Sequence, residues 1–163
     1  MKNREEKTNA IRLLEQKKIP FKVHSYSNTD AISGVEVAAI LHEDPAHVFK
    51  TLVTVGKSNQ HYVFIVPVAE ELDLKKAASV VKEKNMSMIK SKELLPLTGY
   101  IHGGCSPVGM KKLFKTVIHS TAKNYPTIFV SGGMIGLQME LSLEDLKKVV
   151  PILEADIIVD KKE

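Results

Sequence analysis

Apolar residues recur at helical spacing in three places along the chain, each directly after a residue that commonly caps helices. These capping residues are Thr8, Asp73 and Ser142. Each is therefore expected to begin a helix. Further helical turns are expected from Ser33 to Leu41, where Ser33 and Glu36 form a capping-box pattern, after Asp44, and from Ser91 to Leu95, ending at Pro96.

Other apolar runs are β-branched or alternate with polar residues, as strands do. Residues 49–55 and 61–66 flank a short polar segment with turn-forming residues, which predicts a hairpin. Strands and helices then interleave irregularly, which predicts a mixed α/β (α+β) class rather than a doubly wound sheet. The other expected strands are 21–26, 86–89, 115–120, 127–131, 137–141 and 155–159.

Two glycine-rich segments, 103–109 and 131–136, each lie next to a strand-like apolar run. Glycine lets backbone turn tightly or approach a ligand closely, so paired loops of this kind can aim several N–H groups at one oxygen atom. The alternative is a pair of ordinary tight turns. Neither segment matches a phosphate-binding or dinucleotide-binding glycine fingerprint.

Composition narrows the class of protein. The 163 residues, 44% apolar and 26% charged, suit one globular domain and exclude disorder. No apolar run is long enough to span a membrane, and the first residues contain no signal-peptide core. The single cysteine suits a reducing compartment, so we expect a cytoplasmic protein.

Positive charge is concentrated in the middle of the chain, although the net charge is only +4. Residues 75–115 contain nine lysines but only two acidic residues. Such a segment fits either a polyanion such as nucleic acid or a solvated surface. Because no arginine follows Arg12, bidentate reading of bases is not expected.

The residues that could carry chemistry each have a structural alternative. The six histidines lack metal-ligand spacing, so no metal site is expected. Cys105, inside the first glycine segment and near His102, could be a nucleophile or a small packed residue. Lys50 shares a strand face with Leu52, so its ammonium group either reaches solvent at the strand end or enters a pocket.

Several short motifs, taken in order, resemble the YbaK/EbsC group of Cys-tRNA(Pro) deacylases, which are relatives of the editing domain of prolyl-tRNA synthetase. The resemblance runs from about Asn9 to the C-terminus. The motifs that carry it are Phe49-Lys50-Thr51-Leu52, Pro67-Val68-Ala69, Leu72-Asp73-Leu74-Lys75-Lys76, Thr98-Gly99-Tyr100, Gly103-Gly104, Ser106-Pro107, Gly109, Lys111-Lys112, Ser131-Gly132-Gly133, Gly136-Leu137 and Glu140-Leu141.

The resemblance implies one domain over residues 1–163, built on a curved mixed sheet that approaches a barrel, with helices outside. It implies hydrolysis of cysteine from mischarged tRNA(Pro), without metal or other cofactor. Aminoacyl-tRNA is the implied partner, and prolyl-tRNA synthetase is a candidate second partner. Cysteine and proline are close in size, and a pocket separates ligands that differ by one methylene by only about 1–3 kcal/mol, so an editing step is needed.

The resemblance also implies roles for individual residues. Lys50 would contact the terminal adenosine or its phosphate, while the N–H groups of Gly103 and Gly104 would face the ester carbonyl. The substrate's own thiol would attack that carbonyl, so no protein nucleophile is implied. The implied substrate-binding residues are Tyr26, Ser33, Thr51, Ser106, Ser131, Gly132, Gly133 and Gln138.

Two of these positions depart from the family pattern. Some relatives have an aromatic residue where this chain has Ser33, and an aspartate where it has Gln138. Both changes bear on amino-acid preference. Three alternatives therefore stand beside Cys-tRNA(Pro) deacylation: a deacylase of other specificity, such as alanine; a non-catalytic binder of tRNA or nucleotide; and a thioesterase that uses Cys105.

Overall fold

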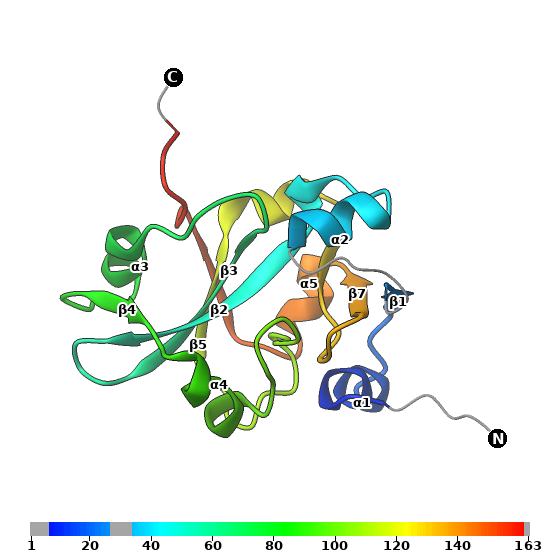
Figure 1. Ribbon diagram of the computed structural model, residues 1–163, viewed down its shortest axis with the longest axis horizontal. Coiled ribbons are helices and arrows are strands. Elements are labelled where there is room, and N and C mark those ends of the chain that lie inside the picture. Colours follow the sequence, from blue (N-terminus) through cyan, green and yellow to red (C-terminus); the bar gives the residue numbers. More distant parts are fainter. Residues whose placement is uncertain (1–6, 27–33, 162–163) are drawn as a thin grey trace.

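The computed structural model describes residues 7–26 and 34–161, and within these ranges the strands form two sheets (Figure 1). The larger sheet has five strands in the order β4-β2-β3-β5-β8. Its antiparallel part joins β2 to β3 and β4, and its parallel part joins β3 to β5 and β5 to β8. These strands are β2 (Phe49–Gly56), β3 (His61–Pro67), β4 (Met86–Met88), β5 (Lys115–His119) and β8 (Ile152–Ala155).

The smaller sheet is antiparallel, with β7 (Leu137–Leu141) between β1 (Lys22–Ser25) and β6 (Ile128–Ser131). A backbone bridge between Val48 and Phe129 joins it to the start of β2. The expected mixed α/β class is confirmed. Its strands are divided between two bridged sheets rather than placed in one curved sheet, and the described residues form no closed barrel.

The helices begin where local capping predicts. The Thr8 hydroxyl oxygen accepts the N–H of Ile11, the Asp73 carboxylate accepts that of Lys75, and the Ser142 hydroxyl oxygen accepts that of Asp145. The helices are α1 (Asn9–Gln16), α2 (Gly34–Ile40), α3 (Leu74–Val80), α4 (Ser91–Thr98) and α5 (Leu143–Lys147), with the short 3₁₀ turns η1 (Pro45–His47) and η2 (Ser120–Asn124).

Two elements differ from the sequence prediction. Helix α4 continues past Pro96 to Thr98, because the Thr98 hydroxyl donates to the Leu94 carbonyl and the N–H of Gly99 closes the last turn. The last strand occupies residues 152–155, not 155–159. Residues 157–159 instead bond to the segment before α3, which removes them from the sheet.

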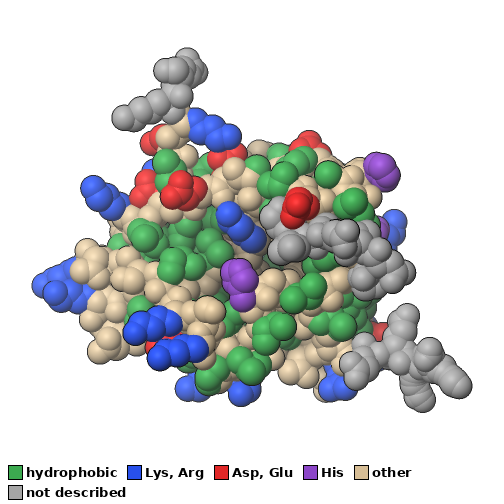
Figure 2. Space-filling view, in the orientation of Figure 1, with side chains coloured by type: hydrophobic (Ala, Val, Ile, Leu, Met, Phe, Trp, Pro, Cys, Tyr) green, Lys and Arg blue, Asp and Glu red, His purple; other side chains and the backbone are tan. Residues whose placement is uncertain are grey.

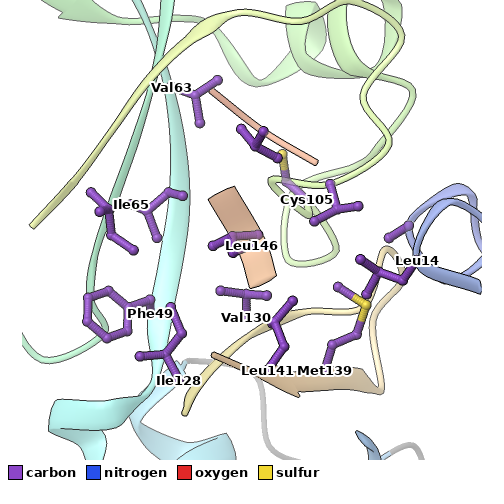
Figure 3. Close-up of a cluster of buried hydrophobic side chains, with 14 of the residues drawn as sticks. Leu14, Phe49, Val63, Ile65, Cys105, Ile128, Val130, Met139, Leu141 and Leu146 are labelled. Atoms are coloured by element: carbon purple, nitrogen blue, oxygen red, sulfur yellow. The ribbon is translucent and has the colours of Figure 1, made fainter. Parts of the chain in front are cut away.

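The core has two main layers, separated by the larger sheet. Alternate side chains of β3 point to opposite faces, so Val63 and Ile65 enter the cluster between the two sheets, while Phe64 and Val66 enter the cluster beneath α3. Figure 3 shows the first cluster, in which side chains of both sheets meet those of α1 and α5. Both faces of β3 are therefore buried, and β2 pairs with it along its length.

Candidate active site

A pocket of about 250 Å³ opens where the start of β2 faces the first glycine segment and the smaller sheet. Its apolar walls come from α2, β2, β6 and β7, together with Leu94 of α4. A small number of polar groups on an apolar wall is the usual composition of a ligand site. The polar side chains in the lining are those of Tyr26, Lys50, Thr51, His102, Ser131 and Gln138.

Lys50 supplies a positive charge to this pocket. It is half-buried, opposite Val66 on β3, and burial lowers the pKa of its ammonium group, an effect that Glu71 and Glu70 partly offset. Among the described residues the ammonium group has no hydrogen bond or salt bridge. This placement favours the interpretation that Lys50 serves a pocket over the alternative that it reaches solvent.

Two further polar groups in the lining are buried without a partner. The hydroxyl oxygen of Thr51 and the amide oxygen of Gln138 make no hydrogen bond with the described part of the chain. A buried polar atom without a partner costs about 1–3 kcal/mol, so such atoms need an explanation. Their place in the pocket lining makes a bound polar ligand the simplest explanation.

Of the two glycine N–H groups expected to face a substrate, only one is left without a hydrogen bond by the described residues. Gly103 lines the pocket with φ +88°, and its N–H has no partner among the described residues. The N–H of Gly104 instead donates to the Ile101 carbonyl over 2.9 Å. The expectation that Gly104 offers its N–H to a substrate is therefore wrong, because this group closes a turn.

In the second glycine segment, Gly132 and Gly133 use their N–H groups internally. That of Gly132 donates to the Leu137 carbonyl over 2.9 Å, and that of Gly133 donates to the Ser131 hydroxyl over 3.2 Å. Ser131 lines the pocket, whereas both glycines lie outside the lining. The expected wall of Gly132 and Gly133 is not formed, since the hairpin between β6 and β7 turns them away.

The remaining expected site residues have mixed placements. Tyr26 lines the pocket, and its N–H donates to the Gly136 carbonyl. Ser106 does not line it, because its side chain is fully buried and its hydroxyl oxygen accepts the N–H of Val108 over 3.2 Å. Ser33 lies outside the described residues.

The sequence did not identify two residues of this region. His102 lines the pocket, whereas its sequence context suggests only metal binding or pairing with Cys105. Its position next to Gly103 is the signal for a place in the pocket. The carboxyl group of Glu43 lies beside Gln138. Nothing in the sequence indicates this position, because an acidic residue in a polar turn is normally solvent-exposed. Within the described ranges, no three potential metal-binding side chains gather, and no helix is long and apolar enough to cross a membrane.

Cys105 also lines the pocket, with only 8% of its surface exposed. Burial raises the pKa of its thiol to about 12. A thiol with this pKa stays protonated at neutral pH, and the thiolate is the nucleophilic form. The environment of Cys105 therefore favours packing over nucleophilic attack.

The sequence model of the aminoacyl-tRNA editing domain matches residues 28–149, about three quarters of the chain. The chain belongs to the aminoacyl-tRNA editing domain family. Within this family, it is 44% identical over 144 residues to a protein of Enterococcus faecalis (strain ATCC 700802 / V583) named "Putative Cys-tRNA(Pro)/Cys-tRNA(Cys) deacylase EbsC". That match covers 88% of both chains, and it confirms the resemblance to the YbaK/EbsC group.

Solved structures share the editing-domain fold. One, described as "a putative trans-editing enzyme for prolyl tRNA synthetase", has a TM-score of 0.83 at 24% identity and covers 96% of this chain and 100% of its own. Another, the hypothetical protein APE2540, has a TM-score of 0.84 at 18% identity, with 93% and 99% covered. At these identities the likeness concerns the fold alone.

Proposed function

We propose that this protein is a trans-editing deacylase that hydrolyses cysteine from mischarged tRNA(Pro). Membership of the editing-domain family and the name of the 44% identical relative support deacylation. The observation that carries the proposal is the meeting of Lys50, Gly103 and Gln138 in one small pocket. The ammonium group of Lys50 suits a phosphate or ribose, and the free N–H of Gly103 suits an ester oxygen. The amide of Gln138 suits a polar aminoacyl group.

The chemistry would be carried by the substrate. The thiol sulfur of the esterified cysteine attacks its own carbonyl carbon and forms a four-membered thiolactone. The bond from that carbon to the ribose oxygen breaks, and the thiol proton passes to the departing ribose oxygen. Water then opens the thiolactone to free cysteine. The protein would hold the reacting atoms together and stabilise the oxyanion, for which the N–H of Gly103 is the candidate donor.

The proposed use of the substrate's thiol agrees with the condition of the nearest protein nucleophiles. Burial keeps the thiol of Cys105 protonated through its raised pKa. The hydroxyl of Ser106 is buried outside the pocket lining and holds its own loop together. Among the described residues, neither group is hydrogen-bonded to a base, as an activated protein nucleophile would need to be.

Lysines on the surface around α3, β4 and α4 would attract the tRNA. Figure 2 shows blue side chains around the part of the molecule that α3, β4 and α4 form, while red ones gather near the C-terminal segment. Lys76 forms salt bridges with Asp156 and Asp160, at 3.1 and 2.8 Å, so its charge is not available to a phosphate. Exposed Lys111 and Lys112 carry no salt bridge with a described residue. Docking on prolyl-tRNA synthetase remains a prediction.

A panel of charged tRNAs tests the proposal. Purified protein is incubated with Cys-tRNA(Pro), Ala-tRNA(Pro), Ser-charged tRNA and Pro-tRNA(Pro), and the remaining ester is measured over time. We expect loss of cysteine alone. Cleavage of the alanine ester would support the alternative specificity. Protection of every ester, with tRNA still bound, would replace the proposal with a non-catalytic binder.

A further inference from the structure

Glu43 lies in the turn between α2 and η1, and its backbone is held in place. His42 adopts φ +58°, and the N–H of Glu43 donates to the Ala38 carbonyl over 2.7 Å, which reverses the chain at the end of α2. Both side-chain oxygens of Glu43 are buried. The turn therefore directs a carboxyl group into the protein, where acidic side chains are rare without a partner.

Glu43 and Gln138 are neighbouring buried groups with unmet hydrogen-bonding capacity. Neither carboxyl oxygen of Glu43, nor the amide oxygen of Gln138, makes a hydrogen bond of normal geometry with the described residues. The Gln138 side chain is 4% exposed and lines the pocket. Burial raises the pKa of Glu43, while the adjacent Gln138 amide favours the charged form and partly offsets that rise.

Among the described residues, the other titratable groups that act on Glu43 are His24 of β1 and Glu140 of β7, which bond to one another. Nε2 of His24 lies 2.9 Å from Oε1 of Glu140, and the Thr127 hydroxyl donates to Oε2 of Glu140 over 2.6 Å. Lys22 further stabilises the charge of Glu140. Gln138 is thus the polar side chain beside Glu43 that lines the pocket, and its amide oxygen has no hydrogen-bond partner among the described residues.

We propose that Glu43 is a positioning residue, which sets whether the oxygen or the nitrogen of the Gln138 amide faces the pocket. An ionised carboxylate only accepts hydrogen bonds, so it holds the amide NH₂ and leaves the amide oxygen to the pocket. A protonated Glu43 donates to that oxygen and turns the NH₂ group inward. Resting on the proposed function, the ionised state would present an acceptor to the α-ammonium or thiol group of the aminoacyl ester.

The first test observes the amide directly and needs no substrate. In the ¹⁵N-labelled full-length protein, the side-chain amide signals of Gln138 are assigned by their loss in Gln138→Met and followed with pH. We expect them to shift with a midpoint above the usual range of a glutamate. In Glu43→Gln the shift should vanish, and it should persist in His24→Gln and in the exposed control Glu144→Gln.

Two results would overturn the proposal: a Gln138 shift that survives in Glu43→Gln, or one that disappears in His24→Gln. Glu43→Gln keeps the side chain's shape and removes a buried charge, so thermal unfolding should show a folded protein. Should it fail to fold, Glu43→Met replaces the carboxyl by an apolar group of similar length. The amide signals of Gln138 should then also stop shifting with pH.

The second test measures deacylation of Cys-tRNA(Pro) against pH. Wild-type kcat/KM should fall on the acid side as Glu43 is protonated, and Glu43→Gln should lose that limb. At neutral pH this variant should raise KM about tenfold, as expected for one misdirected hydrogen bond, with kcat little changed. An unchanged acid limb contradicts the proposal. A wild type that cleaves no ester refutes the proposed function instead, and the amide signals still decide the role of Glu43.

Discussion

The two glycine segments look alike in sequence, yet the protein uses them differently. In the first segment, Gly103 lines the pocket and keeps its N–H free of described partners. In the second, Gly132 and Gly133 use their N–H groups to close the hairpin between β6 and β7. Glycine content marks where backbone approaches closely. Only the hydrogen-bond pattern shows which of these three glycines has a donor left for a ligand.

The second segment supports the first. A Cβ atom on Gly104 would lie 2.9 Å from the Cα of Met134, so the two backbones are packed directly against each other. Neither segment provides charge, since the pocket's ammonium group comes from Lys50 on β2. The comparison therefore separates three functions: charge from β2, a backbone donor from the first segment, and support from the second.

Loss of the β2 charge should have the largest effect. Lys50→Ala removes a group that positions the substrate, and we expect the transition state to lose about 2–4 kcal/mol of stabilisation. This corresponds to a decrease in kcat/KM of about 30- to 900-fold. The fold should be retained, because the lost charge is half-buried and has no salt bridge among the described residues. Lys57→Ala, in the exposed turn after β2, is the matched control. Activity of Lys50→Ala within about twofold of wild type would remove Lys50 from the site.

The same residue predicts a pH dependence. Burial lowers the pKa of Lys50, so the ammonium form is lost at lower pH than in a free lysine. Deacylation that needs this charge should decline as the pH rises through the lowered value. In Lys50→Arg the group stays charged, and the alkaline decline of kcat/KM should disappear. A decline identical in both proteins would assign it to another group.

Local features of the fold were predictable, and long-range ones were not. Helix starts at Thr8, Asp73 and Ser142 follow from side-chain caps a few residues away, which the sequence displays directly. The division into two sheets depends on β7 pairing with β1, more than a hundred residues distant. The predicted position of the last strand was also wrong because of a long-range contact. Residues 157–159 bond to the segment before α3 and not to the sheet.

The site shows the same limit. The position of Lys50 in the pocket agrees with the family motif that suggested it. The turn that occupies the N–H of Gly104 is invisible to a motif, because the motif records residue types and not bond partners. Glu43 was missed because its inward direction comes from the positive φ of His42.

Filling the contact between the two segments should cost stability. In Gly104→Ala the new Cβ meets backbone atoms of Met134, which cannot move aside, so we expect a loss of about 1–3 kcal/mol. This corresponds to a melting temperature lower by about 2–12 °C. Gly132→Ala, whose Cβ meets the adjustable side chain of Leu137, is the control and should lose less. Equal melting temperatures for both variants would contradict the supporting role of the second segment.

The lysines beside the first segment should affect binding modestly and without regard to tRNA sequence. Lys111→Gln with Lys112→Gln removes two exposed charges, and the slope of log affinity against log salt should decrease by about 1–2. Lys17→Gln with Lys18→Gln, at the end of α1, is the matched control. If both double variants keep the wild-type slope, the lysine-rich segment is only a solvated surface.

The smallest effect is expected at Cys105, where the comparison predicts packing within the first segment and no chemistry. Figure 3 shows its side chain among apolar residues of the core cluster, and burial raises its thiol pKa to about 12. Cys105→Ala should lose about 1 kcal/mol of stability through lost packing. Its activity on Cys-tRNA(Pro) should stay within about twofold of wild type, since the substrate's thiol is the proposed nucleophile. Ser-charged tRNA, with its poorer hydroxyl nucleophile, should survive in both proteins.

An acyl-enzyme mechanism predicts the opposite: an inactive alanine variant, cleavage of several aminoacyl esters, and a covalent adduct on Cys105 in intact-protein mass spectra during turnover. The adduct is the decisive observation, because it forms only when Cys105 itself attacks the ester.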